Sequence, residues 1–395
     1  MKILHTSDWH LGQSFMGKSR EEEHKKFFNW LLEVIEKEHI SLLIVAGDIF
    51  DTATPPNYAL ELYYNFLTKL SQSSCSNIIL IAGNHDSIAM LKASQKLLKA
   101  LNIYLIASGD MTEEEIVPIY EYGRLEGVVC AVPFLRDYVV RKSIRGQTFD
   151  EKESALTWGI KEHYRRLYRK AKEYAEGKNI PIIATGHLTT TGAKRVDSER
   201  EIYVGAKVAI EANFLSERFD YVALGHLHTN QKVDYDNIRY CGAPIPLSFG
   251  EAMSQKKVNI VTFNEKRADV HEVAIPLFRQ LLVLRGKTET ILKRLEEVTQ
   301  KESWIEVYVN DDNPFYANKV IREKAGLLGV TLLAVKIEKN IEPSYQRNTK
   351  PISLDELTPL ELFKKRLEKE QIEDERLYNG LITHFKEIVS EVQKR

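Results

Sequence analysis

Residues 78–86 read IILIAGNHD, a short apolar run that stops at a glycine and three polar residues. The run is continuous rather than alternating, which is how a strand buried on both faces reads. Four other segments have the same design: 2–4, 42–46, 182–184 and 221–224. Amphipathic stretches such as 20–39 and 59–70 lie between them. Strands that alternate with helices predict an α/β fold with layered central sheets.

A carboxylate, amide or imidazole follows each of the five predicted strands. The clusters are Ser7-Asp8-Trp9-His10, Gly47-Asp48-Ile49-Phe50-Asp51, Gly83-Asn84-His85-Asp86, Gly186-His187 and Gly225-His226-Leu227-His228. Ligands of open α/β sheets bind beyond the carboxyl ends of the strands. The glycine before four of the five clusters suits a tight turn or a close approach of the backbone. We therefore expect these side chains to converge on one rim.

The polar set is suited to divalent metal ions. Oxygen and imidazole ligands without thiolates suit Mn²⁺, Fe²⁺ or Zn²⁺ better than Ca²⁺ or an iron–sulfur cluster. Seven ligands are too many for one tetrahedral ion with an open position, but they suit two ions that share Asp48. Two ions roughly 3.5–4 Å apart can activate water and bind both oxygens of a phosphoryl displacement. The sequence predicts a two-metal phosphoesterase with these ligands: Asp8, His10, Asp48, Asn84, His187, His226 and His228.

Three further residues of these clusters have predicted roles. His85 is expected to face the phosphate and to protonate the leaving oxygen or neutralise developing charge. Asp51 and Asp86 are expected to orient metal-binding histidines, with solvated turn positions as the alternative. Each motif alone is more often an ordinary turn. Their coincidence at five strand ends favours the metal site.

The chain of 395 residues is expected to contain three parts. Residues 1–275 form the metallophosphoesterase domain, and residues 276–344 form a small α+β capping domain with a β-α-β-α-β order, which is expected to bind DNA. Residues 345–395 form a polar linker and two helices, the first of which begins with a capping box at Thr358-Pro359-Leu360-Glu361. The last helix has one apolar face, which would pack either on its own domain or on a partner.

Composition limits the class of protein and the compartment. The formal net charge is -1, so DNA affinity must come from local basic patches. The stretch with Arg136, Arg141, Lys142 and Arg145 is the predicted phosphate contact, whereas the basic helix over 161–172 is equally well explained as a solvated face. Three separate cysteines argue against a disulfide framework or zinc ribbon. With no signal-peptide pattern and no apolar run of about 20 residues, a cytoplasmic location without membrane contact is expected.

The five clusters together resemble the complete motif set of the calcineurin-like metallophosphoesterases. The surrounding words HTSDWHLGQ, AGDIFDT, GNHDS, GHLTTTG and ALGHLHTNQ are more specific and resemble the bacterial SbcD nucleases, relatives of the archaeal and eukaryotic MRE double-strand-break nucleases. The resemblance is strong over the first domain. It extends to the capping domain and to LTPLELFKKRLE at 357–368, which is similar to the tail by which SbcD proteins hold the SbcC ATPase.

The resemblance implies a division of the ligands between two ions, usually manganese. One ion would take Asp8, His10, Asp48 and His228, and the other would take Asp48, Asn84, His187 and His226. His85 would act as the acid or stabilise the transition state. Some archaeal relatives have a histidine at the position of Asp51, so that residue's role near the phosphate is not transferred.

The resemblance also implies an activity and partners. The family degrades double-stranded DNA ends in an ATP-dependent reaction, cleaves single strands and opens hairpins, as a homodimer joined to SbcC. This chain has no Walker-type loop, so a partner must handle the ATP. A small-molecule or cyclic-nucleotide phosphodiesterase of the same superfamily is the alternative, because the metal motifs alone do not separate the two. A non-catalytic scaffold predicts eroded ligands, and none is missing.

Overall fold

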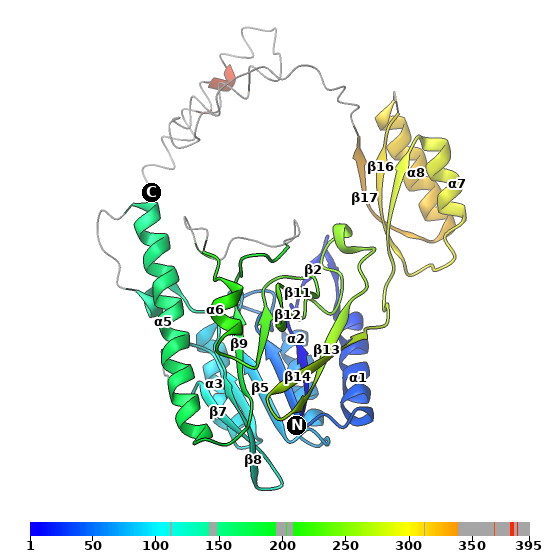
Figure 1. The fold of residues 1–395 in the computed structure, drawn as a ribbon. Coiled ribbons are helices and arrows are strands. Elements are labelled where there is room, and N and C mark those ends of the chain that lie inside the picture. Colours follow the sequence, from blue (N-terminus) through cyan, green and yellow to red (C-terminus); the bar gives the residue numbers. More distant parts are fainter. Residues whose placement is uncertain are drawn as a thin grey trace. The chain divides into compact units, whose positions relative to one another are not determined.

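The computed structural model describes residues 1–110, 113–141, 148–194, 203, 208–311 and 313–338, and the separate positions 367, 380–382 and 385 (Figure 1). The chain divides into two compact units, Met1–Glu338 and Lys339–Arg395. The predicted linker and C-terminal helices over 345–395 lie outside the described residues except at those separate positions.

Two six-stranded sheets form the centre of the first unit. The first has the order β14 (Arg267–Ala274), β13 (Lys257–Asn264), β1 (Lys2–Thr6), β4 (Leu42–Ala46), β5 (Asn77–Ile81) and β6 (Ile103–Ile106). The second has the order β11 (Gln231–Val233), β12 (Tyr235–Tyr240), β10 (Tyr221–Gly225), β9 (Ile182–His187), β8 (Arg124–Cys130) and β7 (Ile116–Glu121). Strands β1, β4, β5 and β6 are parallel to one another, and so are β8, β9, β10 and β12. The predicted α/β class with layered sheets is confirmed.

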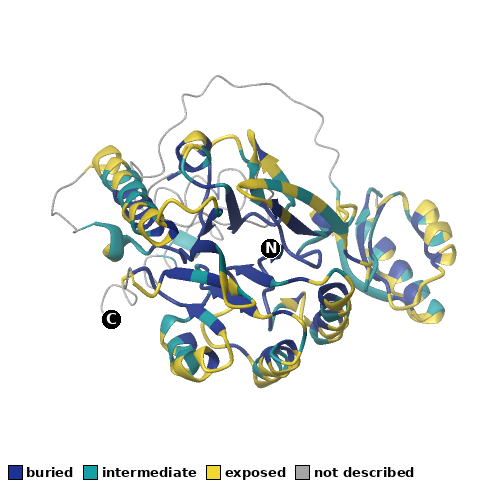
Figure 2. Cartoon of the chain, turned by 60° about the horizontal axis from the view of Figure 1, so that its bottom comes forward, coloured by how far each residue is buried: buried dark blue, intermediate teal, exposed yellow. Residues whose placement is uncertain are grey.

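The two sheets pack face to face, and helices cover their outer faces (Figure 2). The helices on the first sheet are α1 (Glu21–Lys37), α2 (Asn57–Leu70) and α3 (Ile88–Lys99), and those on the second are α5 (Phe149–Ala175) and α6 (Ala212–Ser216). Strand β4 shows why the runs are continuously apolar. Leu42 and Ile44 point into the core between the sheets, whereas Leu43 and Val45 point into the core under the helices. Both faces of the strand are therefore buried.

The small C-terminal part of this unit is a three-stranded parallel sheet. It contains β15 (Leu281–Gly286), α7 (Thr288–Glu296), β16 (Trp304–Val309), α8 (Pro314–Leu328) and β17 (Thr331–Ile337), with β16 in the middle. The predicted β-α-β-α-β order is confirmed. Since all three strands are parallel and alternate with helices, α/β describes this part more accurately than α+β. The two helices pack on one face of the sheet.

The other face of the small sheet contacts the metallophosphoesterase part through Trp304. Its indole stacks on Phe15, with ring centroids 5.5 Å apart. The guanidinium of Arg279 lies 4.6 Å from the Trp304 ring, and that of the buried Arg20 lies 5.3 Å from it. Glu23 pairs with both arginines, at 2.8 Å and 3.2 Å. This aromatic and ionic contact fixes the small sheet close to the segment that follows β1.

The buried His24 of α1 predicts a specific dependence of stability on pH. Its Nε2–H donates to the carbonyl of Trp9 at 2.7 Å, and burial lowers its pKa to about 3, with the charge of Arg20 adding to the effect. Below a pH of about 6.5, the ordinary pKa of histidine, His24 is protonated in the unfolded chain but stays neutral in the folded chain. The free energy of unfolding therefore falls as the pH falls. From pH 7 to pH 5 this residue should cost about 2 kcal/mol.

We expect His24→Gln to reduce that loss, because glutamine is neutral and can donate the same hydrogen bond. The measurement is the urea midpoint of the metal-free chain in EDTA at pH 7 and at pH 5. A midpoint that drops equally in the variant and in the natural chain would contradict the assignment.

Candidate metal centre

The predicted site residues lie where the sequence places them, in the loops that follow β1, β4, β5 and β10 and, for His187, at the last residue of β9. Most line one pocket of about 320 Å³. Its polar lining includes His10, Asp48, Asp51, Asn84, His85, His226 and His228. Asp8 and His187 are buried directly beneath it, in contact with these residues. The structure therefore brings the seven predicted ligands and His85 together.

Four of the predicted ligands have a left-handed backbone. The φ angles are 51° at Asp8, 46° at His10, 48° at Asp48 and 89° at His226. Such a conformation is uncommon outside glycine, costs of the order of 1–3 kcal/mol each and is found most often at functional sites. The loops therefore adopt a strained backbone conformation that directs these side chains toward the site.

Two glycines permit the close approach of the loops. Gly47 has a φ of +87°, and a Cβ there would collide with the imidazole of His187. A Cβ at Gly225 would collide with the carbonyl oxygen of Ala46, which accepts the hydrogen bond from His187. Both positions therefore require the absence of a side chain.

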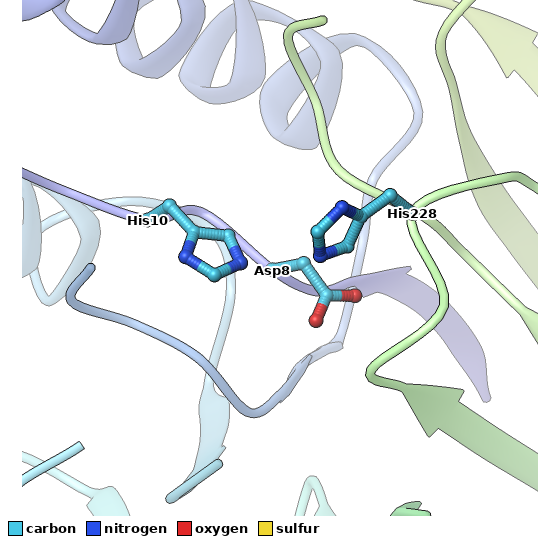
Figure 3. Close-up of side chains that lie close together, drawn as sticks. All are labelled: Asp8, His10 and His228. Atoms are coloured by element: carbon cyan, nitrogen blue, oxygen red, sulfur yellow. The ribbon is translucent and has the colours of Figure 1, made fainter. Parts of the chain in front are cut away.

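One group of ligand atoms comes from Asp8, His10 and His228, which approach one another within 4.8 Å (Figure 3). The Nδ1 atom of His10 lies 3.1 Å from an oxygen of Asp51. This leaves Nε2 of His10 buried, without a hydrogen bond in the described part of the chain and 3.7 Å from Oδ2 of Asp48. A buried imidazole nitrogen aimed at carboxylates fits a metal ion.

A second group comes from Asp8, Asp48 and His187. The Nδ1–H of His187 donates to the carbonyl of Ala46 at 3.0 Å. Its Nε2 lies 3.0 Å from Oδ1 of Asn84 and 3.2 Å from Oδ2 of Asp48. Because Nδ1 carries the proton in that hydrogen bond, Nε2 of the neutral ring and the two oxygens are all electron-pair donors. They can lie this close together only if a proton or a metal ion sits between them. The His226 ring lies beside His187, with centroids 5.4 Å apart.

The pKa shifts of Asp8, Asp48 and His187 also indicate that this site favours a bound positive charge. Burial raises the pKa of Asp8 to about 6, with His187 opposing and Asp48 adding to the rise. Burial alone would lower the pKa of His187, but the charge and hydrogen bond of Asp48 raise it to about 9. Burial would raise the pKa of Asp48, yet His187 lowers it below the ordinary value. A bound ion must displace the proton of His187, so metal affinity should increase with pH.

The two aspartates expected to orient histidines differ. Asp51 contacts His10 through its carboxylate, and its main-chain carbonyl accepts from Nδ1 of His85 at 2.7 Å. For Asp86 the expectation is wrong. Its carboxylate accepts from three backbone N–H groups of the loops after β4 and β5. A buried carboxylate between two loops is stabilised by the nearest donors, and here these are backbone amides.

Sequence reasoning missed a buried ion pair behind His228. Lys256 Nζ lies 2.5 Å from Oε2 of Glu251 and donates to the main-chain carbonyl of His228 at 3.1 Å. The other oxygen of Glu251 lies 3.9 Å from Nδ1 of His228. The pair thus holds the backbone of a predicted ligand and places a carboxylate near its ring. Neither residue follows one of the five predicted strands, so no sequence motif identifies this ion pair.

We expect Glu251→Gln to weaken metal binding about 10- to 100-fold, which is the usual effect of removing a group that orients a ligand. Isothermal titration with Mn²⁺ measures this. Glu272→Gln is the matched control, because Glu272 also pairs with cations, Lys257 and Arg239, but on the surface. Equal Mn²⁺ affinities in the two variants would show that Glu251 does not support metal binding.

The structure describes two of the four predicted DNA-contacting residues. Arg136 donates to the main-chain carbonyl of Asp86 at 3.0 Å, and Arg141 pairs with Asp137 at 2.6 Å. Lys142 and Arg145 lie outside the described residues. Contact with phosphate stays a prediction for all four.

Comparison with known protein families gives two matches. The family described as calcineurin-like phosphoesterase matches residues 1–230, and the family described as type 5 capsule protein repressor C-terminal domain matches residues 277–371. In the described part of the chain, no helix combines the length and apolar character that a bilayer crossing requires.

Curated relatives match over most of the chain, and two of them over almost all of it. The SbcD subunit of the SbcCD nuclease of Escherichia coli (strain K12) is 38% identical over 387 residues, which cover 95% of this chain and 94% of the relative. The protein of that name from Bacillus subtilis (strain 168) is 31% identical and covers 94% and 93%. The one from Rhodobacter capsulatus is 33% identical and covers 72% and 71%.

Proposed function

The chain belongs to the calcineurin-like phosphoesterases, within the family of SbcD nuclease subunits, and from this premise we propose that it hydrolyses the phosphodiester bonds of DNA. The observation that carries the proposal is the position of Asp48. Its Oδ2 lies 3.7 Å from Nε2 of His10 and 3.2 Å from Nε2 of His187, one ligand from each side of the centre. A shared carboxylate of this kind suits a pair of divalent ions.

The residues fit the proposed pair of ions. Asp8, His10, Asp48 and His228 would hold one, and Asp48, Asn84, His187 and His226 would hold the other. When bound, such ions lower the pKa of a water and stabilise charge on the phosphate oxygens. Manganese is the proposed metal, since the ligands are oxygens and imidazoles without a thiolate.

His85 is the proposed proton donor or charge-stabilising group. The Asp51 carbonyl can only accept, so Nδ1 of His85 carries the proton in that hydrogen bond. The backbone N–H of His85 donates to Oδ1 of Asp48 at 2.9 Å. These two contacts fix the ring at the pocket with Nε2 directed away from the Asp51 carbonyl, where it can serve the leaving oxygen.

We propose SbcC-type ATPase binding through the C-terminal part of the chain, and a homodimer that gives a two-plus-two assembly. The supports are the family match that extends to residue 371 and the one-sided apolar pattern of the last helix that the sequence predicts. Removing the residues after about 345 should abolish co-purification with the ATPase and leave metal-dependent hydrolysis in place. Unchanged co-purification would place the contact elsewhere.

The test of the proposed activity compares two substrates. The full chain with Mn²⁺ is given linear DNA, and in parallel a chromogenic phosphodiester. Degradation of DNA that requires the metal supports the nuclease. Hydrolysis of the chromogenic diester alone would favour the alternative, a small-molecule or cyclic-nucleotide phosphodiesterase. No hydrolysis of either would favour a binding scaffold.

A further inference from the structure

The small sheet carries a row of one aromatic and two basic side chains. Tyr308 on β16 is paired in register with Arg285 on β15 and Lys336 on β17. The guanidinium of Arg285 lies 4.0 Å from the centroid of the Tyr308 ring, and Nζ of Lys336 lies 5.2 Å from it. We call these three residues the Tyr308 platform.

The platform forms one wall of a cleft of about 590 Å³. The rest of the lining is mixed: the segments 13–16 and 247–250 supply apolar side chains such as Met16, Leu247 and Phe249 together with polar ones, and Glu306 lies beside the platform. The volume lies within the range of about 300–1,000 Å³ typical of ligand sites. The cleft shares Gln13, Ser14 and Leu247 with the metal pocket, so the two spaces adjoin each other.

The platform is both anchored and accessible. Trp304 begins the same strand, β16, and it is held by Phe15, Arg20 and Arg279. Since side chains alternate along a strand, Tyr308 lies on the same face as Trp304. Tyr308 itself is half-buried, and the side chains of Arg285 and Lys336 are 54% and 50% exposed. A rigid strand therefore presents a surface that a ligand can reach.

The two basic side chains of the platform differ in how firmly their ion-pair partners hold them. Arg285 pairs with Glu338 at 2.7 Å, and Lys336 pairs with Glu306 at 2.6 Å. The Arg285–Glu338 pair is exposed on both sides and contributes little, because water screens it and the side chains lose freedom. The Lys336–Glu306 pair is held more firmly, because Glu306 is a buried carboxylate. A phosphate can replace a carboxylate partner, most readily at Arg285, since Glu338 is itself 40% exposed whereas Glu306 is buried.

We propose that this cleft binds an unpaired nucleotide of the strand whose phosphate occupies the metal pocket, with its base stacked on the Tyr308 platform. Bases stack on aromatic rings and on guanidinium planes. The Arg285 guanidinium lies over the Tyr308 ring, so the base would stack on this pair rather than on the bare ring. A base inside a duplex has both faces covered by its neighbours. The cleft therefore selects single strands and frayed ends over continuous duplex. This inference rests on the proposed function.

The test measures binding of a single-stranded oligonucleotide and of the matched duplex by fluorescence anisotropy. The full-length chain is used with Mn²⁺ and carries His85→Asn to suppress cleavage. Tyr308→Ala should weaken single-strand binding about 5- to 100-fold, the effect of losing one base–aromatic stack, and should weaken duplex binding much less. Tyr308→Phe keeps the ring and should bind like the parent. Tyr122→Ala is the control, since Tyr122 is fully exposed on the β7–β8 hairpin, away from both pockets.

A second readout locates the contact. A 2-aminopurine base moved along the oligonucleotide should be quenched at one position, and the Tyr308→Ala variant should lose this quenching while the Tyr308→Phe variant keeps it. Equal single-strand affinity for Tyr308→Ala and the parent, in a chain that degrades DNA, would overturn the inference. A natural chain that hydrolyses the chromogenic diester but not DNA would instead overturn the proposed function.

Discussion

Asp48→Asn is expected to remove the metal pair and to lower phosphodiester hydrolysis about a thousandfold or more. A metal ion contributes several kcal/mol to the transition state, which corresponds to that factor. The substituted asparagine would keep an oxygen for the backbone N–H of His85, so the loop would keep its hydrogen bond. It would place a neutral amide where the carboxylate now faces His10 and His187. The amide nitrogen has no lone pair for a metal.

Metal content after dialysis, measured by elemental analysis, is the direct readout for this variant, beside the rate with a chromogenic diester. The natural chain should retain two ions, and the variant should retain one or none. Asp220→Asn is the matched control. Asp220 is a half-buried carboxylate that accepts from the backbone of Ile182, at the start of β9 and thus at the far end of that strand. Two ions and an unchanged rate in Asp48→Asn would show that Asp48 does not bridge.

The elements that hold the site are the most predictable part of the fold. Strand β4 is predicted at 42–46 and is found at Leu42–Ala46, because both of its faces are buried and every residue is apolar. The edge strand β14 is not predicted. Half-exposed and fully exposed residues run along Arg267–Ala274, and only pairing with β13 makes this segment a strand. Pairing between strands is a tertiary property that local pattern does not contain.

The residues of the metal site also divide into a part that the sequence predicts and a part that it does not. The seven predicted ligands and His85 follow the apolar runs directly, so position in the sequence is enough to identify them. Of the groups that support them, the sequence identifies Asp51, which contacts His10, but not the others. Asp86 contacts backbone amides of a loop 36 and 37 residues away. Glu251 and Lys256 reach His228 from the segment before β13. These contacts depend on how loops fold over one another, and no spacing along the chain encodes them.

His85→Asn should abolish cleavage without releasing the metals. The ring is placed by two contacts, Nδ1 with the Asp51 carbonyl and the backbone N–H with Asp48, and only the first involves the imidazole. Asparagine can still donate to the Asp51 carbonyl, but it cannot transfer a proton at neutral pH. The loss of a positioned acid corresponds to a rate about 100- to 10,000-fold lower. The loss should be largest for DNA, whose leaving alkoxide needs a proton.

A substrate whose leaving group needs no proton separates the two roles proposed for His85. With a nitrophenyl diester, an acid should be nearly dispensable, whereas a group that stabilises charge on the phosphate should still be required. The structure also adds a third role to test, because His85 lies in a group with His10 and Asp51 whose ligand atoms approach within 4.8 Å. If His85→Asn loses an ion in elemental analysis, His85 is a ligand. If it keeps both ions and loses only DNA cleavage, the imidazole is the proton donor.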